Sequence, residues 1–125
     1  MPINSKQKGA KAERDVAKFI NKALGTNLKR TPQSGGMDFK GDLQDISLDS
    51  VLHGFHFEIK DQKAIRPKEW YRQATGDCPS GKIPLVIWKN HTERKVGNLT
   101  INDVTWMVEI GLNDFLGIIE RELKV

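Results

Sequence analysis

The stretch "FHFEIK", residues 55–60, alternates apolar and polar side chains one by one. Successive side chains of a β-strand point to opposite faces of a sheet, so this alternation predicts a strand with one apolar and one polar face. The polar face carries His56, Glu58 and Lys60. Any fold of this chain must bury the apolar face of the strand. It must also accommodate Glu58 and Lys60, two residues apart, on the opposite face.

The chain begins with a helical pattern, from Ser5–Gly9 to Gly25. Glu13 borders the apolar stripe of this helix, and no base stands three or four residues from it. A salt bridge within the helix therefore does not explain this acid. The stripe itself recurs at helical spacing and consists of Ala12, Val16, Phe19, Ile20, Ala23 and Leu24.

The rest of the chain alternates strand and helix patterns. Short strands are predicted at 26–32 and 42–48, a glycine-containing loop at 33–41, and a turn before the strand at 55–60. A helix from Pro67 to about Ala74 and a loop precede the apolar run 83–89, which is typical of a central strand covered on both faces. One or two strands follow within 96–110. The last segment predicts a helix with one apolar face, made of Leu112, Phe115, Leu116, Ile119 and Leu123.

This order predicts an α/β domain with a central mixed sheet flanked by helices. A chain of 125 residues has room for one core, so we expect residues 1–125 to form a single domain. The net charge of +4 and the pI near 9.3 favour a polyanionic partner. The single cysteine, Cys78, and the lack of an apolar stretch of membrane-spanning length favour a cytoplasmic protein with no membrane partner.

Asp42 stands where the glycine loop enters the second predicted strand. If that strand neighbours the strand at 55–60, Asp42 and Glu58 converge at one end of the sheet. Carboxylates brought together repel, which raises a pKa or recruits a cation, and such oxygen ligands suit Mg²⁺ or Mn²⁺. Lys60 would lie about 7 Å beyond Glu58, within reach of a phosphate or an attacking water but not as a metal ligand.

Four features in this order, Glu13, "KGD" at 40–42, "EIK" at 58–60 and "WYRQA" with Gln73, resemble the PD-(D/E)xK nuclease superfamily. More narrowly, "KGAKAERDVAKFI", "RTPQSGG", "FEIKDQK" and "IPLVIWK" are similar to segments of the Holliday junction resolvases of archaea and some phages. The likeness spans roughly Lys8 to Lys89 and fades over the last third. It implies a restriction-endonuclease-like core and a Mg²⁺-dependent endodeoxyribonuclease, with Mn²⁺ as the alternative cofactor, in the cytoplasm of a prokaryote or a phage-infected cell.

The resemblance also implies roles for individual residues. Asp42, Glu58 and the carbonyl of Ile59 would hold the metal, and Glu13 would complete the site directly or through water. Where the family has Pro-Asp this chain has Gly-Asp, and Asp38 competes with Asp42 as the catalytic aspartate. We favour Asp42 because the apolar Leu43 follows it into the strand.

Lys60 would assist the attacking water, and Gln73 would orient groups at the edge of the site. Arg30, Ser34 and Lys89 match positions that lie near the scissile phosphate or the DNA backbone in such enzymes. The charge pattern adds further candidates for backbone contacts, so that the predicted DNA-binding residues are Lys8, Lys11, Arg30, Ser34, Arg72 and Lys89, with Lys6, Arg66 and Lys68 as additional bases.

The sequence thus favours a resolvase of four-way junctions, an activity of DNA recombination and repair. Such a junction has near-twofold symmetry and needs two matched nicks, so we expect a homodimer acting on branched double-stranded DNA. Two alternatives remain open: a PD-(D/E)xK endonuclease for other branched or duplex DNA, and a catalytically silent DNA-binding module. Histidines 53, 56 and 91 lack metal-ligand spacing and are interpreted as structural, and the tryptophans at 70 and 88 as core or cover.

Overall fold

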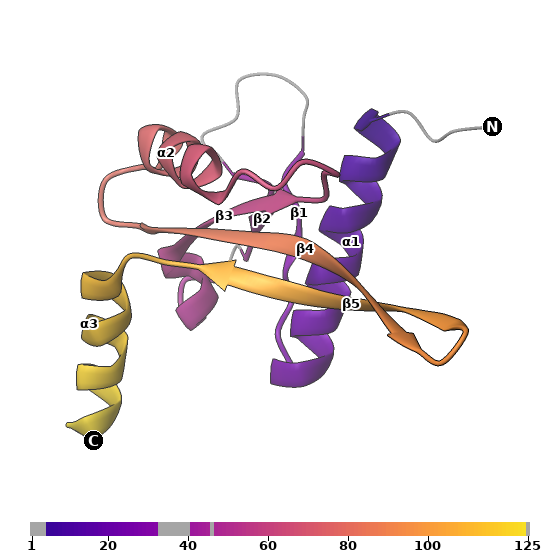
Figure 1. The fold of residues 1–125 in the computed structure, drawn as a ribbon. Coiled ribbons are helices and arrows are strands. Elements are labelled where there is room, and N and C mark those ends of the chain that lie inside the picture. Colours follow the sequence, from indigo (N-terminus) through magenta and orange to yellow (C-terminus); the bar gives the residue numbers. More distant parts are fainter. Residues whose placement is uncertain (1–4, 33–40, 46, 125) are drawn as a thin grey trace.

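The computed structural model describes residues 5–32, 41–45 and 47–124, and its elements follow one another in the predicted order (Figure 1). Within these ranges, no helix combines the length and the apolar character needed to cross a membrane. The elements are α1 (Ser5–Leu24), β1 (Lys29–Arg30), β2 (Leu43–Gln44), the 3-10 helix η1 (Val51–Gly54), β3 (Phe55–Lys60), α2 (Pro67–Asp77), β4 (Ile83–Val96), β5 (Leu99–Glu109) and α3 (Leu112–Leu123).

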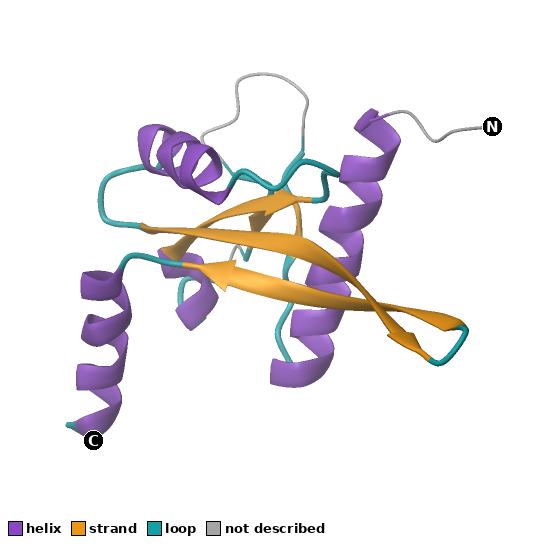
Figure 2. Cartoon of the chain, viewed as in Figure 1, coloured by secondary structure: helices purple, strands orange, loops and turns teal. Residues whose placement is uncertain are grey.

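The described strands form one five-stranded sheet in the order β1-β2-β3-β4-β5 (Figure 2). β3 and β4 are parallel, and the other neighbouring pairs are antiparallel. A parallel pair needs a long crossover connection, and α2 supplies it between β3 and β4. This mixed sheet with flanking helices confirms the predicted fold class.

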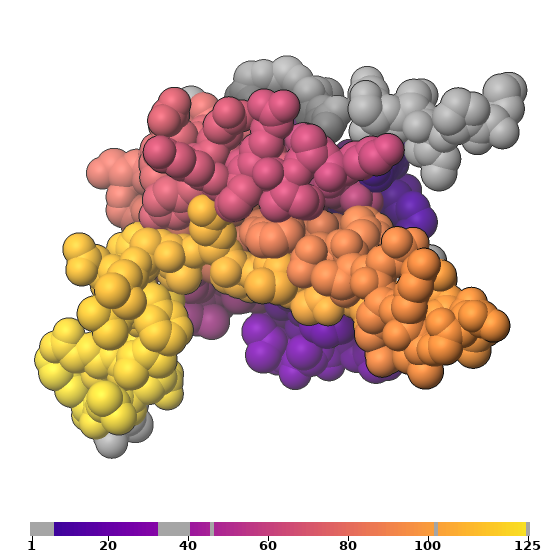
Figure 3. All heavy atoms as spheres, viewed as in Figure 1, coloured from indigo at the N-terminus to yellow at the C-terminus, as the bar shows by residue number. Residues whose placement is uncertain are grey.

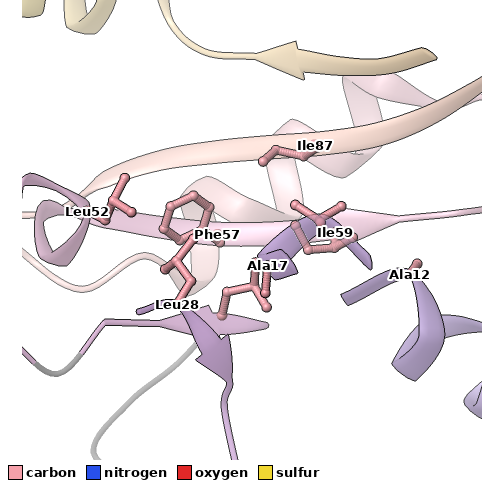
Figure 4. Close-up of a cluster of buried hydrophobic side chains, with 9 residues drawn as sticks. Ala12, Ala17, Leu28, Leu52, Phe57, Ile59 and Ile87 are labelled. Atoms are coloured by element: carbon pink, nitrogen blue, oxygen red, sulfur yellow. The ribbon is translucent and has the colours of Figure 1, made fainter. Parts of the chain in front are cut away.

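The two faces of the sheet carry separate cores. Val86 and Ile87 are neighbours in β4, so their side chains point to opposite faces. Val86 packs with Trp70 of α2, whose ring lies 6.0 Å from that of Trp88, which confirms both tryptophans as core residues. Ile87 belongs to the larger core under α1 (Figure 4), which includes Ala12, Ala17, Leu28, Leu52, Phe57 and Ile59.

α1 meets this core through a face that the sequence pattern predicts only in part. Val16 is buried, but Phe19 and Leu24 are 67% and 60% exposed and Ala23 is exposed as well, so the predicted stripe is wrong at these three positions. Glu13 and Ala17 are buried instead. With about 100° per residue, these two lie on one side of Val16 and Phe19 lies on the other. The helix is therefore rotated so that an acidic residue faces the interior.

The second strand is shorter than predicted, since only Leu43–Gln44 of the stretch 42–48 pairs as a strand. Asp45 is buried, and its Oδ1 accepts the backbone N–H of Ser47 at 3.0 Å. This local turn competes with strand pairing and ends β2. The turn predicted before β3 is the 3-10 helix η1. The loop residues Ser34 and Asp38 lie outside the described residues.

The strand predicted at 83–89 continues to Val96 and turns at Gly97, which has a φ of +64°, into β5. Segment 96–110 therefore holds the end of β4 and one further strand. The distal half of this hairpin and α3 both project from the body of the molecule (Figures 1 and 3). α3 is helical as predicted, but the described part of it buries no residue.

Gly41 immediately precedes Asp42 and adopts a φ of +93°. A Cβ at this position would lie 3.0 Å from the carbonyl oxygen of Phe57 and 3.1 Å from Nδ1 of His56. We expect Gly41→Ala to lower the free energy of unfolding by about 2 kcal/mol or more, measured by urea denaturation, because strain and crowding add. Gly25→Ala is the matched control, with a φ of +69° but open space around its Cβ. Equal losses in the two variants would contradict the crowding at Gly41.

Candidate active site

Asp42 is fixed against the edge of β3 by the backbone of that strand. β2 pairs with β3 through one residue pair, Leu43 with Phe57. The N–H of Asp42 donates to the carbonyl of Phe57 at 2.7 Å, and the N–H of Ile59 donates to Oδ2 of Asp42 at 2.6 Å. The Asp42 carboxylate thus accepts a hydrogen bond from β3 that a backbone carbonyl of a neighbouring strand would otherwise accept. This bond holds the Asp42 carboxylate beside Glu58, the convergence that the sequence predicts.

A pocket of about 450 Å³ lies between α1, the end of β3 and α2. A larger hollow, of about 770 Å³ along α1 and β1, is lined by basic, apolar and amide residues without a carboxylate, so we place the candidate site in the smaller pocket. Lys8 also borders this pocket. The structure brings together here all six predicted catalytic and metal-binding residues: Glu13, Asp42, Glu58, Ile59, Lys60 and Gln73.

Three of the carboxylates that line the pocket, those of Glu13, Asp42 and Glu58, are mostly withdrawn from water. Glu13 and Glu58 are 8% and 6% exposed. The pKa of Asp42 is raised to about 7, mainly by burial, then by the charge of Glu58 and less by that of Glu13, while the bond from Ile59 and the charge of Lys60 oppose the shift. Burial is also the main cause that raises the pKa of Glu13. The repulsion among these carboxylates falls when one of them binds a proton or when a cation binds between them.

Glu13 receives its basic partner from another element. Nε of Arg30, in β1, lies 3.4 Å from Oε2 of Glu13. The absence of a partner within α1 is therefore compensated across the fold, and Arg30 lowers the pKa of Glu13 against the effect of burial. The predicted contact of Arg30 with DNA stays a prediction.

Lys60 points toward α2. Its Nζ donates a hydrogen bond to Oε1 of Gln73 at 3.1 Å. Because Gln73 lies on a helix whose neighbouring turn packs against the sheet, this bond restricts the flexible lysine to the pocket side of β3. The geometry agrees with the predicted places of both residues, and their catalytic roles stay predictions.

The polar face of β3 is largely covered by the rest of the fold. His56 is 1% exposed, and its Nε2 lies 3.3 Å from Oε1 of Glu58 without the alignment of a hydrogen bond. The cause is α2, which covers this face through the core around Trp70 and Val86. The candidate site therefore lies on a face of β3 that α2 partly covers.

The donor set of the pocket fits a hard cation. Asp42, Glu58 and Glu13 offer carboxylate oxygens, and the carbonyl of Ile59 is the fourth predicted oxygen ligand. Over the described ranges, no three His, Cys, Asp or Glu side chains already stand in the arrangement of a metal site. The metal-binding role of these residues stays a prediction.

The predicted DNA-binding residues lie in different places. Lys11 is exposed and pairs with Asp15 at 2.7 Å, Arg72 is exposed on α2, and Ser34 lies outside the described residues. Lys8 and Lys89 instead approach the same carboxylate, Asp61. The sequence interpretation missed this acid.

His91 was also missed, because it was interpreted as structural. Its Nε2 lies 3.4 Å from Oδ1 of Asp61. The signal that could have found both residues is the strand register. Parallel pairing of Lys60 with Trp88 brings the ends of β3 and β4 side by side, so that Asp61 comes next to the basic residues of β4.

A family model described as "Phage putative PDDEXK endonuclease" matches residues 4–113 of the chain. The matched region contains every element from α1 to β5, and with them every residue of the pocket. No curated protein and no solved structure gives a match.

The raised pKa of Asp42 predicts a pH-dependent stability in EDTA. Between the ordinary value of 3.8 and about 7, the folded state holds a proton that the unfolded state has released. We therefore expect the free energy of unfolding to fall as pH rises through this window, by on the order of 2–4 kcal/mol, and the Asp42 contribution to level off above it. Urea denaturation between pH 4 and pH 8 measures it.

Asp42→Asn should reduce this slope and leave the smaller part that Glu13 contributes, whereas Asp103→Asn, at an exposed ion pair with Arg94, should keep the whole slope. An unchanged slope in Asp42→Asn would assign the effect to other groups.

Proposed function

Because the chain belongs to the phage PDDEXK endonuclease family, we propose that it is a metal-dependent endodeoxyribonuclease that resolves four-way (Holliday) DNA junctions by paired nicks. The observation that carries the proposal is the convergence of Asp42, Glu58 and Lys60 with Glu13 in one pocket. Chemistry on a phosphodiester needs a cation, a water and a positive group near the phosphate, and this pocket has residues for each.

We assign Asp42, Glu58, the Ile59 carbonyl and Glu13 as ligands of Mg²⁺, with Mn²⁺ as a substitute. When bound, this ion polarises the phosphodiester, lowers the pKa of a bound water and stabilises the leaving 3′-oxygen. Asp42 must lose its proton to act as a ligand, so metal binding weakens as pH falls below about 7.

Lys60 is held by Gln73 at 3.1 Å on the pocket side of β3. In this position it stabilises the attacking water or the negative charge that develops on the phosphate. Attack of the water oxygen forms a new bond to phosphorus and breaks the bond to the 3′-oxygen. The products are a 5′-phosphate and a 3′-hydroxyl.

Two nicks at symmetric positions require two active sites related by a twofold axis. We propose that a second copy of this chain packs on α3 and the edge strand β5. The apolar side chains of α3 are exposed, although they form one face of the helix. β5 is an edge of the sheet, and Val104 and Val108 are 49% and 58% exposed on it.

The character of this surface supports a homodimer. Its exposed apolar side chains are those of Leu112, Phe115, Leu116, Ile119 and Leu123 on α3, together with Val104 and Val108 on β5. Across a twofold axis, the apolar face of α3 in one copy contacts the same face in the other copy. Both apolar faces are then buried in a single interface. Isolated exposed leucines are ordinary, but a whole helical face without cover marks an interaction surface.

The second candidate is a PD-(D/E)xK endonuclease for other branched or duplex DNA. The family description favours it equally, because it names an endonuclease without a substrate. A catalytically silent DNA-binding module is less favoured, since it has no need to keep Asp42, Glu58 and Lys60 together.

We expect the purified protein to introduce paired, symmetric nicks into a labelled four-way junction in Mg²⁺, and none in EDTA or in a matched linear duplex. Glu58→Gln should lower the cleavage rate by about 100-fold or more while DNA binding is retained, because it removes a charge from the site and keeps the side-chain size. Glu69→Gln, at an exposed pair with Arg66, is the matched control.

Three results would change the assignment. Cleavage of both substrates would favour the broader endonuclease. Binding without cleavage in Mg²⁺ or Mn²⁺ would favour the silent module. Full activity of Glu58→Gln would overturn the site.

The dimer surface has its own test. We expect the wild-type chain to sediment as a dimer at micromolar concentration and Leu116→Glu to sediment as a monomer, because a charge cannot be buried in an apolar interface without a partner. Leu24→Glu, at a residue that is 60% exposed at the C-terminal end of α1, should leave the dimer intact. A monomeric wild-type chain, or a dimer that persists in Leu116→Glu, would contradict this interface.

A further inference from the structure

Asp61 is an almost buried acid surrounded by three bases. Only 9% of its side chain is exposed. Its Oδ1 lies 3.8 Å from Nζ of Lys8 and 3.4 Å from Nε2 of His91, and its Oδ2 lies 3.9 Å from Nζ of Lys89. These four residues, which we call the Asp61 cluster, come from α1, the end of β3 and the adjacent part of β4.

The Asp61 cluster borders the pocket described above. Asp61 directly follows Lys60, and both Asp61 and Lys8 line the pocket wall. The parallel pairing of β3 with β4 carries Lys89 and His91 alongside. A group bound to the cluster would therefore lie next to the candidate catalytic residues, on the side of α1 rather than of Gln73.

The cluster is unbalanced in charge. One carboxylate faces two lysines, so the net charge is positive even with a neutral histidine. Two of the three ion-pair distances, those from Asp61 to Lys8 and to Lys89, are 3.8 Å and 3.9 Å, which is long for a close ion pair. Asp61 thus brings the three bases together but does not saturate their N–H donors. The remaining donors can bind a second anion.

The bases reach solvent while the acid does not. The side chains of Lys8 and His91 are 44% and 53% exposed, and that of Lys89 is 21% exposed and lies over the Trp106 ring, 5.5 Å from its centroid. An incoming anion therefore meets the bases first and Asp61 last. The three bases thus form an anion-binding surface, and the carboxylate of Asp61 behind them holds their side chains in position.

We propose that Lys8, Lys89 and His91 bind a phosphate of the DNA backbone beside the pocket, and that Asp61 is the positioning residue that holds them together. The inference rests on the proposed function only in taking DNA as the substrate. Phosphate contacts fix the register of a protein on DNA without reading its sequence. The Asp61 cluster thereby selects which neighbouring phosphodiester enters the pocket.

The direction of one change in affinity tests the role of Asp61. Asp61→Asn removes a negative charge near the DNA. If Asp61 only neutralises charge, the variant should bind DNA more tightly. If it positions the three bases, the variant should bind about 5–10-fold more weakly despite its more positive surface, because charge-assisted hydrogen bonds to the phosphate lose their geometry. Asp103→Asn removes an equally negative side chain from an ion pair on the hairpin and serves as the matched control.

Binding is measured with a labelled four-way junction and a linear duplex in EDTA, where cleavage does not interfere. The plot of log K against log salt should become shallower by about 0.9 in Lys89→Ala, as expected for one lost phosphate contact. Asp61→Asn combined with Lys89→Ala should lose less affinity than the two single losses added, because both act on one site.

Tighter binding by Asp61→Asn, or unchanged affinity and salt slope in both Lys89→Ala and His91→Ala, would overturn the inference. Should Asp61→Asn fail to fold, judged by thermal unfolding, the lysine and histidine variants decide alone. A protein that binds but does not cut would contradict the proposed function and leave this test intact.

Discussion

The hydrogen bond from the backbone of Ile59 to the carboxylate of Asp42 is the contact on which the site depends. It joins the end of a two-residue strand to the middle strand of the sheet, and it does so with a side chain. A backbone pair at this point would have continued β2 and closed the edge of β3. The side-chain bond instead sets the Asp42 carboxylate at the rim of the pocket, and it opposes the rise in the pKa of Asp42 that burial and the charge of Glu58 cause.

The pocket shows how a fold can hold several acids together. Burial and mutual repulsion both work against the charged forms of Asp42 and Glu13. The opposing contributions are few: Arg30 beside Glu13, the Ile59 amide beside Asp42, and Lys60 at a greater distance. The positive groups of the chain only partly balance the negative charge of these carboxylates. The site is therefore suited to bind a cation, which supplies the missing positive charge.

The sequence predicted those parts of the molecule that depend on local periodicity. The alternation in β3, the amphipathic pattern of α1 and the apolar run of β4 each identify an element, and the ordered motifs identify the residues of the pocket. The predictions that were wrong or missing concern contacts between different helices and strands. The rotation of α1, which exposes Phe19 and buries Glu13, depends on the shape of the sheet beneath it. The Asp61 cluster depends on the register of β3 against β4, which no local pattern encodes.

The parallel pairing of β3 with β4 also constrains the order in which the molecule folds. The hairpin of β4 and β5 closes a short loop and needs only local contacts, so its formation is fast. β3 can join β4 only after α2 has crossed the sheet, and Asp42 bonds to Ile59 across 17 residues of chain. Long loops close late because their entropy is lost before their contacts form. The acids of the pocket are thus brought together by contacts between separate segments of the chain, so a chain in which β2 has not paired with β3 has no assembled site.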